Sequence, residues 1–189
     1  MSIVTPDNLI QGPATLYRGA FQATEPADST AALNATPAAS AWTDCGGTTD
    51  GVKLAIENTY SELEVDQIVE VVGSRLTKRA TTVETNMAEV TLDNLVYALN
   101  GGTTASGSGY KTFEPAAADA SSQPNYSAVM FDGFAPLSYR RRVIVRKVLS
   151  TDSIELAYTK DKQTVLAVKL TAHYVSGAIK PYKIIDGTP

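Results

Sequence analysis

Alternation of apolar and polar side chains with a period of two is the feature that most constrains the fold of this chain. In the stretch 52–57 every second side chain is a large aliphatic one, and the side chains between are charged or small. After a break at 58–61 the pattern resumes over 61–72, where acidic residues oppose Leu and Val, and only the pair Gln67–Ile68 is out of phase. Successive side chains of a β-strand point to opposite faces, so both stretches predict half-buried strands, with a bulge at the exchanged pair.

Further strands are expected along most of the remaining chain. The Thr-rich stretch 75–89 has few large apolar side chains on either face, which favours a wetted sheet surface over a dry core. Four C-terminal strands and an extended tail are predicted near 125–134, 138–149, 153–160, 163–174 and 180–189. With 189 residues, the chain is long enough for one domain with a genuine core. We therefore expect a single, mainly β and mostly antiparallel domain over 1–189.

One stretch, 91–100, has clear helical periodicity, because its leucines and Val96 share one face. Thr91 is the expected N-cap, and Gly101–Gly102 ends the helix. Residues 22–50 and 101–124 are rich in Ala, Thr, Ser, Gly and Pro and poor in large apolar side chains, so both are expected to be long loops. Residues 1–15 form an expected N-terminal arm.

Composition excludes several classes of protein. No apolar run approaches the length of a membrane span, and the first residues lack the basic and apolar segments of a signal peptide. A net charge of −4 argues against a general nucleic-acid binder. The single cysteine, Cys45, excludes an internal disulfide, and together with the single histidine, His173, it cannot build a Cys/His zinc site. We expect no cofactor and no metal.

No catalytic constellation is evident, so an enzyme is not expected. The Gly-rich stretch 101–111 lacks the spacing of a phosphate-binding loop and follows a helix. His173 lies in an alternating strand, and Cys45 has no flanking base to lower the pKa of its thiol. The acidic run 57–70 has neither the spacing of a calcium loop nor a feature that would single out one carboxylate as a general acid.

Charge is divided unevenly along the chain. Residues 1–100 carry 13 acidic and 5 basic side chains, whereas residues 101–189 carry 7 acidic and 11 basic ones. These halves are either complementary surfaces for self-association or solvated faces. The basic run 140–147 is open to the same two interpretations, and Trp42 either pins its loop to the core or contacts another copy. The candidates for contacts between copies are Arg140, Arg142, Arg146, Trp42 and Tyr110.

The segment AWTDCGGTTDGVKLAIENTYSELEVDQIVEVVGSRLTKRATTVETNMAEVTLDNLVYALN at 41–100, with KPYKIIDG at 180–187, resembles the major tail protein (tail-tube protein) of long, flexible-tailed bacteriophages. In that family a Trp–Gly-rich turn leads into a strand. An acidic strand ending in a Gly-Ser turn follows, and then a Thr-rich strand and one short helix. The resemblance covers about a third of the chain strongly and the rest in architecture.

The resemblance implies an antiparallel β-sandwich or barrel with one short α-helix and long loop arms, assembled as hexameric rings that stack into a hollow tube. Such a tube conducts double-stranded DNA from the virion to the host. It implies tape-measure and tail-terminator partners, no membrane, and a place in the virion tail after assembly in the host bacterial cytoplasm. The arms 1–15, 22–50 and 101–124 are then candidates for reaching adjacent subunits. The acidic residues expected to face the lumen are Glu62, Glu64, Asp66, Glu70 and Glu84.

Two other functions stay open at this point. The inner tube of a contractile injection system shares the expected fold, and a sheath would distinguish it. A β-sandwich module that binds carbohydrate or a receptor is expected to have an aromatic platform, and only 7% of this chain is aromatic.

Overall fold

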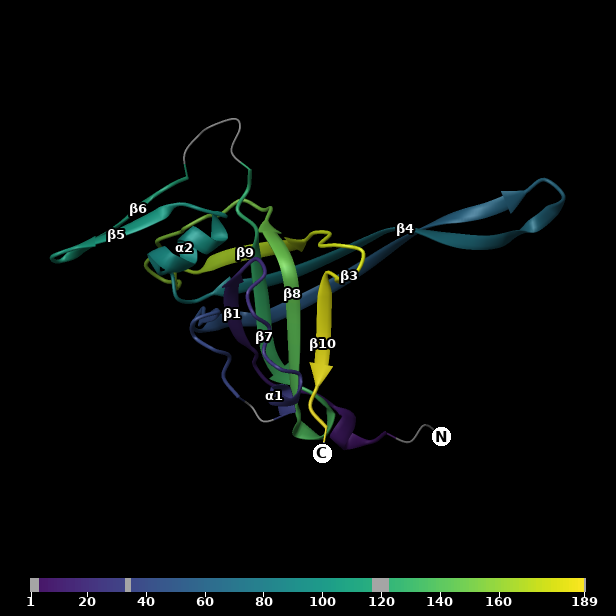
Figure 1. The fold of residues 1–189 in the computed structure, drawn as a ribbon, viewed down its shortest axis with the longest axis horizontal. Helices are drawn as coiled ribbons and strands as arrows, with labels where there is room; N and C mark the ends of the chain where they lie inside the picture. Colours follow the sequence, from purple (N-terminus) through teal and green to yellow (C-terminus); the bar gives the residue numbers. More distant parts are fainter. Residues whose placement is uncertain (1–3, 33–34, 117–122, 189) are drawn as a thin grey trace.

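The computed structural model describes residues 4–32, 35–116 and 123–188, which fold around one eight-stranded antiparallel sheet (Figure 1). The strand order is β2-β1-β7-β8-β9-β4-β3, and β10 also pairs with β8. The strands are β1 (Thr15–Ala20), β2 (Trp42–Asp44), β3 (Thr48–Val65), β4 (Ile68–Met87), β7 (Ser127–Phe134), β8 (Arg140–Ser150), β9 (Leu166–Ala172) and β10 (Tyr182–Asp186). The helices are α1 (Ser29–Ala32) and α2 (Leu92–Ala98), with short 3₁₀ turns at Pro6–Asn8 and Pro136–Ser138.

Strand β8 divides the sheet into two layers because its two ends have different neighbours. Residues 141–145 pair with β10, whereas 148–150 pair with β9. Strands β9, β4 and β3 therefore leave the plane of β1, β7 and β8 and cross behind them (Figure 1). The large core fills the space between the layers and includes Leu16, Val83, Met87, Val129, Val143, Val145, Val148, Leu166 and Leu170. The expected antiparallel, mainly β fold of the sandwich type is confirmed.

A smaller core covers the opposite face of β7 and β8. Trp42 lies in it at 3% exposure, beside Met130 and Ile144, and its indole Nε1 donates to the carbonyl of Thr24 at 2.9 Å. Gly19 pairs directly with Trp42, and a Cβ at this position would lie 2.9 Å from the indole ring. Trp42 therefore pins its loop to the core, which was one of its two sequence interpretations.

A buried ion pair fixes the loop after β1 to the sheet. The guanidinium of Arg142, 1% exposed, donates from Nε and Nη2 to the two carboxylate oxygens of Asp132, its cross-strand partner, at 2.7 and 2.6 Å. The same guanidinium donates to Thr30 Oγ1 at 3.2 Å and to the Ala35 carbonyl at 2.9 Å. One residue of β8 thus holds β7 and the α1 loop together.

The expected strands within 52–72 differ from the observed ones. Residues 58–61 do not break the strand: β3 continues through them, with a register shift at Thr59/Tyr60. The expected single strand over 61–72 is instead the end of a hairpin, and the out-of-phase pair Gln67–Ile68 marks the turn where β4 begins. The alternation in both strands was real, but the turn that separates them carries no Gly or Pro to announce it.

The expected helix is observed, whereas one expected strand is absent and one expected loop contains short elements. The helix is confirmed as α2, and Thr91 Oγ1 accepts from the Asn94 backbone N–H at 3.2 Å as its N-cap. Residues 153–160 form no strand, although Ile154 and Leu156 pack on the large core. Within 22–50 the chain forms α1 and β2, and residues 33–34 lie outside the described residues.

The second expected loop, 101–124, begins with a hairpin. Its strands are β5 (Thr103–Gly107) and β6 (Tyr110–Glu114), and residues 117–122 lie outside the described residues. The hairpin rests on α2 through Asp93, whose carboxylate accepts from Lys111 Nζ at 2.7 Å. The period-two pattern did not predict this hairpin, because both strands are short and mostly exposed and therefore need no alternation of apolar side chains.

Neighbouring residues of β8 offer a matched comparison of buried and exposed ion pairs. We expect Asp132→Ala to destabilise the fold by about 3–5 kcal/mol, because it leaves the Arg142 guanidinium buried without its carboxylate. Asp186→Ala, which removes the partner of the exposed Arg141, should cost less than about 1 kcal/mol. Urea unfolding of both variants followed by circular dichroism measures the difference. Equal losses would show that burial of Arg142 does not govern the cost.

Candidate assembly surface

The outer ends of β3 and β4 project far beyond the rest of the sheet. Strand β9 pairs with β4 only from Thr82 to Met87, so beyond that point β4 keeps β3 as its single neighbour. Residues 56–79, here called the arm, are all exposed except the half-buried Gly73. Ten residues of β3 lie in the arm, which corresponds to a reach of roughly 30 Å. Figure 1 shows the arm extending away from the body.

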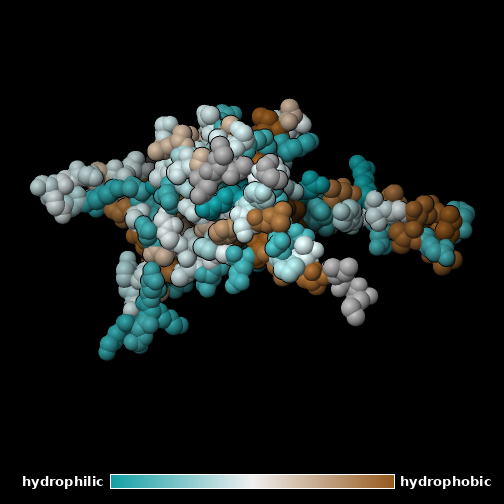
Figure 2. Space-filling view, turned by 90° about the horizontal axis from the view of Figure 1, so that it is seen from below, coloured by the Kyte–Doolittle hydropathy of each residue, from teal (hydrophilic) through white to brown (hydrophobic). Residues whose placement is uncertain are grey.

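The arm carries large apolar side chains that no other described residue covers. Val69, beside the turn, is fully exposed, Leu63 is 53% exposed and Val72 is 55% exposed. Val65 pairs with Ile68 across the two strands, so their side chains share one face next to the turn. The tip appears brown in Figure 2, at the end of the projection. The expectation that these side chains are half-buried in their own chain is wrong, since no second layer lies against them.

Four of the five predicted lumen-facing acids belong to the arm. Glu62 and Glu64 alternate with Leu63 along β3, so both point to the face opposite Leu63 and Val65. Asp66 lies in the turn, and Glu70 follows it on β4. Among the described residues none of the four carboxylates forms a salt bridge.

The fifth acid, Glu84, is separated from the others and has its charge compensated. It lies on the body of the sheet between Lys53 of β3 and Lys169 of β9, which pair with it directly. Its carboxylate accepts from Lys169 Nζ at 3.0 Å and from Lys53 Nζ at 3.2 Å. These bonds hold the pKa of Glu84 below its ordinary value, with Lys169 as the larger cause.

The predicted contacts between copies are mostly satisfied within this chain. Arg142 and Trp42 are buried, and Arg146 forms a bidentate pair with Glu25. These three side chains thus make contacts within the chain itself, which leaves their predicted role between copies a prediction. Arg140 lies over the Phe134 ring at 5.1 Å from its centroid, and Tyr110 is 65% exposed at the turn of the β5–β6 hairpin.

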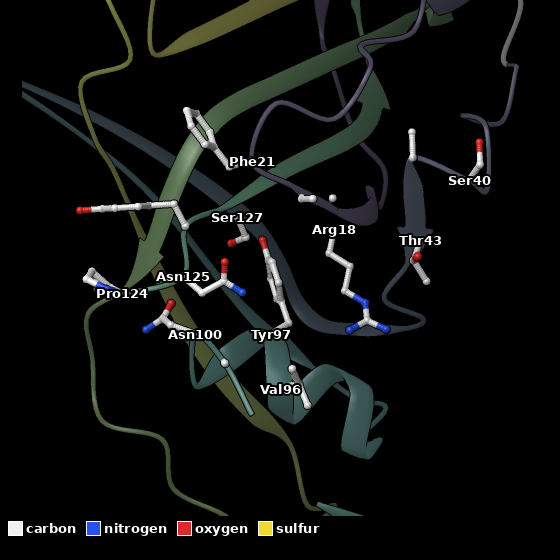
Figure 3. A pocket seen from close by; sticks show the side chains of 15 residues that line it. Arg18, Phe21, Ser40, Thr43, Val96, Tyr97, Asn100, Pro124, Asn125 and Ser127 are labelled. Carbon is white, nitrogen blue, oxygen red and sulfur yellow. The ribbon is translucent and has the colours of Figure 1, made fainter. Parts of the chain in front are cut away.

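A groove of about 720 Å³ opens between β1, β2, α2 and the chain before β7 (Figure 3). Arg18 extends from β1 into it and donates from Nη1 to the Asp93 carbonyl at the start of α2. The Arg18 Nε is buried and has no partner among the described residues. Tyr97, Asn100 and Ser127 add polar atoms to the lining, which contains no carboxylate or imidazole. Such a lining can hydrogen-bond a ligand but supplies no general base.

Cys45 and His173, the residues that the sequence offered as a nucleophile and a base, have surroundings that do not favour these roles. Burial raises the pKa of the Cys45 thiol to about 12, so it stays protonated and non-nucleophilic at neutral pH. His173 stacks edge-on against Tyr126, with 5.3 Å between ring centroids. The described residues contain no group of His, Cys, Asp and Glu that could hold a metal ion. Within that part of the chain, no helix has the length and apolar character needed to cross a membrane.

Comparison with known proteins yields one family. A family model described as "Phage tail tube protein" matches residues 4–186, nearly the whole chain. No individual curated protein matches the sequence.

The two ion pairs of Glu84, with Lys53 and with Lys169, give a prediction that NMR titration of the side-chain carboxyl groups can check. In the folded protein the pKa of Glu84 should lie below its ordinary value of 4.5. Its contribution to stability is then complete above pH 4.5 and disappears as the pH falls through the lower, folded-state pKa. Lys169→Met should raise this pKa more than the control Lys53→Met does, because the Lys169 bond is the larger cause. A pKa unmoved by Lys169→Met would contradict the assignment.

Proposed function

Because the chain belongs to the phage tail tube protein family, we propose that it polymerises as stacked hexameric rings into the hollow tube that conducts phage DNA to the host. The family is one of structural proteins of the virion tail. Ring formation, stacking and DNA passage are the steps that this proposal adds.

The exposed arm is the observation that carries the proposal. An isolated two-stranded hairpin is marginally stable in water, and this one exposes apolar side chains along both strands. Another copy that covers the arm would remove that apolar area from water, which is favourable by about 25 cal/mol per Å². A monomer gains nothing from such an element, whereas a polymer gains a repeated contact.

Open sheet edges support ring closure. Among the described strands, β2 and β3 end the sheet and β10 pairs only with β8, so each presents unpaired backbone groups on one side. Exposed edges are templates for pairing with another chain, and closure into a ring of sheets removes them. A contact between different edges of neighbouring copies is heterologous, and it closes when the rotation between copies divides a full turn.

Alternation along β3 provides a surface for passing DNA. We place Glu62 and Glu64 toward the bore, because they share the face opposite the apolar Leu63 and Val65. Six copies would contribute about twelve such carboxylates per ring, and duplex DNA carries one negative charge per roughly 1.7 Å of its axis. Repulsion keeps DNA from sticking to the wall, acting over about 8 Å at physiological salt. Glu84, with its two lysines, presents a net positive charge instead.

The remaining partners follow from this role. A hollow tube of set length requires a tape-measure protein inside it during assembly and a terminator protein at its end. The subunits are made and assembled in the host bacterial cytoplasm and end in the virion tail.

Electron cryo-microscopy of the purified chain at high concentration, beside phage particles that carry it, tests the proposal. Hollow tubes of sixfold rings are the expected result, and a coat of sheath around them would assign the chain to a contractile tail. Monomers alone, with no tube density for this chain in the particles, would overturn the proposal.

Shortening the arm should separate folding from assembly. Replacing residues 60–77 by Asn-Gly lets the Thr59–Lys78 pair close a two-residue turn. The removed side chains are exposed, so the unfolding midpoint should stay within about 2 °C of the wild type while tubes are lost. Thermal unfolding and electron microscopy measure the two effects. Normal tubes from the shortened chain would show that the arm makes no assembly contact.

Charge reversal on the proposed bore face should affect DNA passage and not assembly. In a phage carrying Glu62→Lys and Glu64→Lys, tubes should form normally and genome ejection should slow, because the wall then attracts DNA. Lys53→Glu, on the body of the sheet, is the control for a surface charge change of similar kind. Ejection at the wild-type rate from the double variant would remove Glu62 and Glu64 from the bore.

A further inference from the structure

We infer that the arm of one copy docks by its tip into a hollow beside Trp42 on a second copy, with Asp66 and Glu70 paired to Lys147 and Lys180. This inference rests on the proposed function, since it names the surface that receives the arm in the polymer. The residues that line the hollow belong to the body of the molecule, whereas the tip lies at the end of the projection (Figure 1).

The hollow is apolar and of a size that fits aliphatic side chains. It has a volume of about 220 Å³, and its lining includes Phe21, Trp42, Ala128, Ile144, Val175 and Ile179. An engineered apolar cavity of roughly 150 Å³ binds one benzene, so this hollow has room for one or two Val or Ile side chains. Ile179 is 47% exposed at its edge, and Trp42 and Ile144 form its buried side.

Two lysines without a carboxylate partner lie beside this hollow. The Lys147 ammonium stands 5.4 Å from the ring centroid of Phe21, a lining residue, and 4.1 Å from that of Tyr126. Lys180 follows Ile179 directly, and its carbonyl accepts from Arg146 Nη1 at 2.7 Å. Arg146 and Glu25, which also line the hollow, are paired with each other. Among the salt bridges of the described residues, neither Lys147 nor Lys180 takes part.

The tip of the arm has the complementary chemistry in a small space. Val65, Ile68 and Val69 surround the turn and are 44%, 51% and 101% exposed. Asp66 in the turn and Glu70 beside it are carboxylates with no salt-bridge partner among the described residues. An apolar centre flanked by charges of one sign therefore meets an apolar hollow flanked by charges of the other, a combination that gives both affinity and register.

The relation between tip and hollow determines what the contact builds. Because a projection on one copy fills a hollow elsewhere on the next, the contact is heterologous. In a docked pair, the hollow of the first copy and the tip of the second stay free to bind further copies. The contact therefore repeats from copy to copy. Glu62 lies farther from the turn than Val65, Ile68 and Glu70, so docking of the tip leaves it for the bore.

Cysteine cross-linking of the full-length chain tests this contact. Val69→Cys and Ile179→Cys replace exposed side chains, and the native Cys45 is 1% exposed and does not compete. Under mild oxidation at high protein concentration, we expect a disulfide-linked ladder of multimers on a non-reducing gel. The control pair, Val69→Cys with Tyr158→Cys, uses a residue that is 80% exposed and does not line the hollow. The yield of the test pair should exceed that of the control at least tenfold.

The outcomes distinguish this inference from the proposed function. Tubes in the microscope with equal cross-linking by the two pairs would overturn the docking site and leave the tube function standing. A selective ladder without tubes or rings would support the docking site and count against the tube.

Exchanging the charges of Glu70 and Lys180 tests the proposed ion pair while the two introduced cysteines stay the same. In the Val69→Cys, Ile179→Cys background, Glu70→Lys should lower the ladder yield about tenfold, because it places two like charges together. Adding Lys180→Glu should restore most of that yield. Failure of the second change to restore it would remove the Glu70–Lys180 pair from the contact.

Discussion

A two-stranded ribbon cannot bury its own faces, and this constraint governs the outer part of the molecule. Each face of the arm needs a second layer, and the described residues supply none past Thr82, the last residue of β4 that pairs with β9. Apolar side chains such as Leu63 and Val69 therefore stay in water until another molecule covers them. We propose the arm as half of an interface, which accords with the membership of the chain in the phage tail tube protein family.

Several charges of the body are paired within the chain, in contrast to the acids at the tip of the arm. Arg142 binds Asp132, Arg146 binds Glu25, and Lys183 binds Asp28 at 2.6 Å, so the basic strand holds its own loop. Ion pairs of this kind fix geometry where one partner is buried and contribute little where both are exposed. The four acids of the arm that were predicted to face the lumen have no salt-bridge partner among the described residues, and Lys147 and Lys180 beside the Trp42 hollow are the partners that we propose for Asp66 and Glu70.

Local patterns predicted elements better than they predicted partners. The alternation over 52–57, the helix at 91–100 and the strands that became β7 and β8 follow from short-range rules that need no knowledge of the rest of the chain. The turn at Asp66–Gln67 was not predicted from the sequence, because it lacks Gly or Pro and interrupts the alternation by only two residues. Arg140, Arg142 and Arg146 looked equivalent in the sequence. Their different surroundings come from the preceding strand β7 and from the α1 loop and Glu25, which lie more than a hundred residues away along the chain.

The sequence by itself determined the mainly β character and the helix at 91–100, since periodicity expresses both locally. Only the tertiary structure decided which apolar side chains are buried. Val83 and Val69 are alike in the sequence pattern, yet Val83 is fully buried and Val69 is fully exposed. The physical reason is that burial requires a second layer. Whether a strand has one depends on where β9 ends and β8 divides the sheet, and not on the residues of the strand itself.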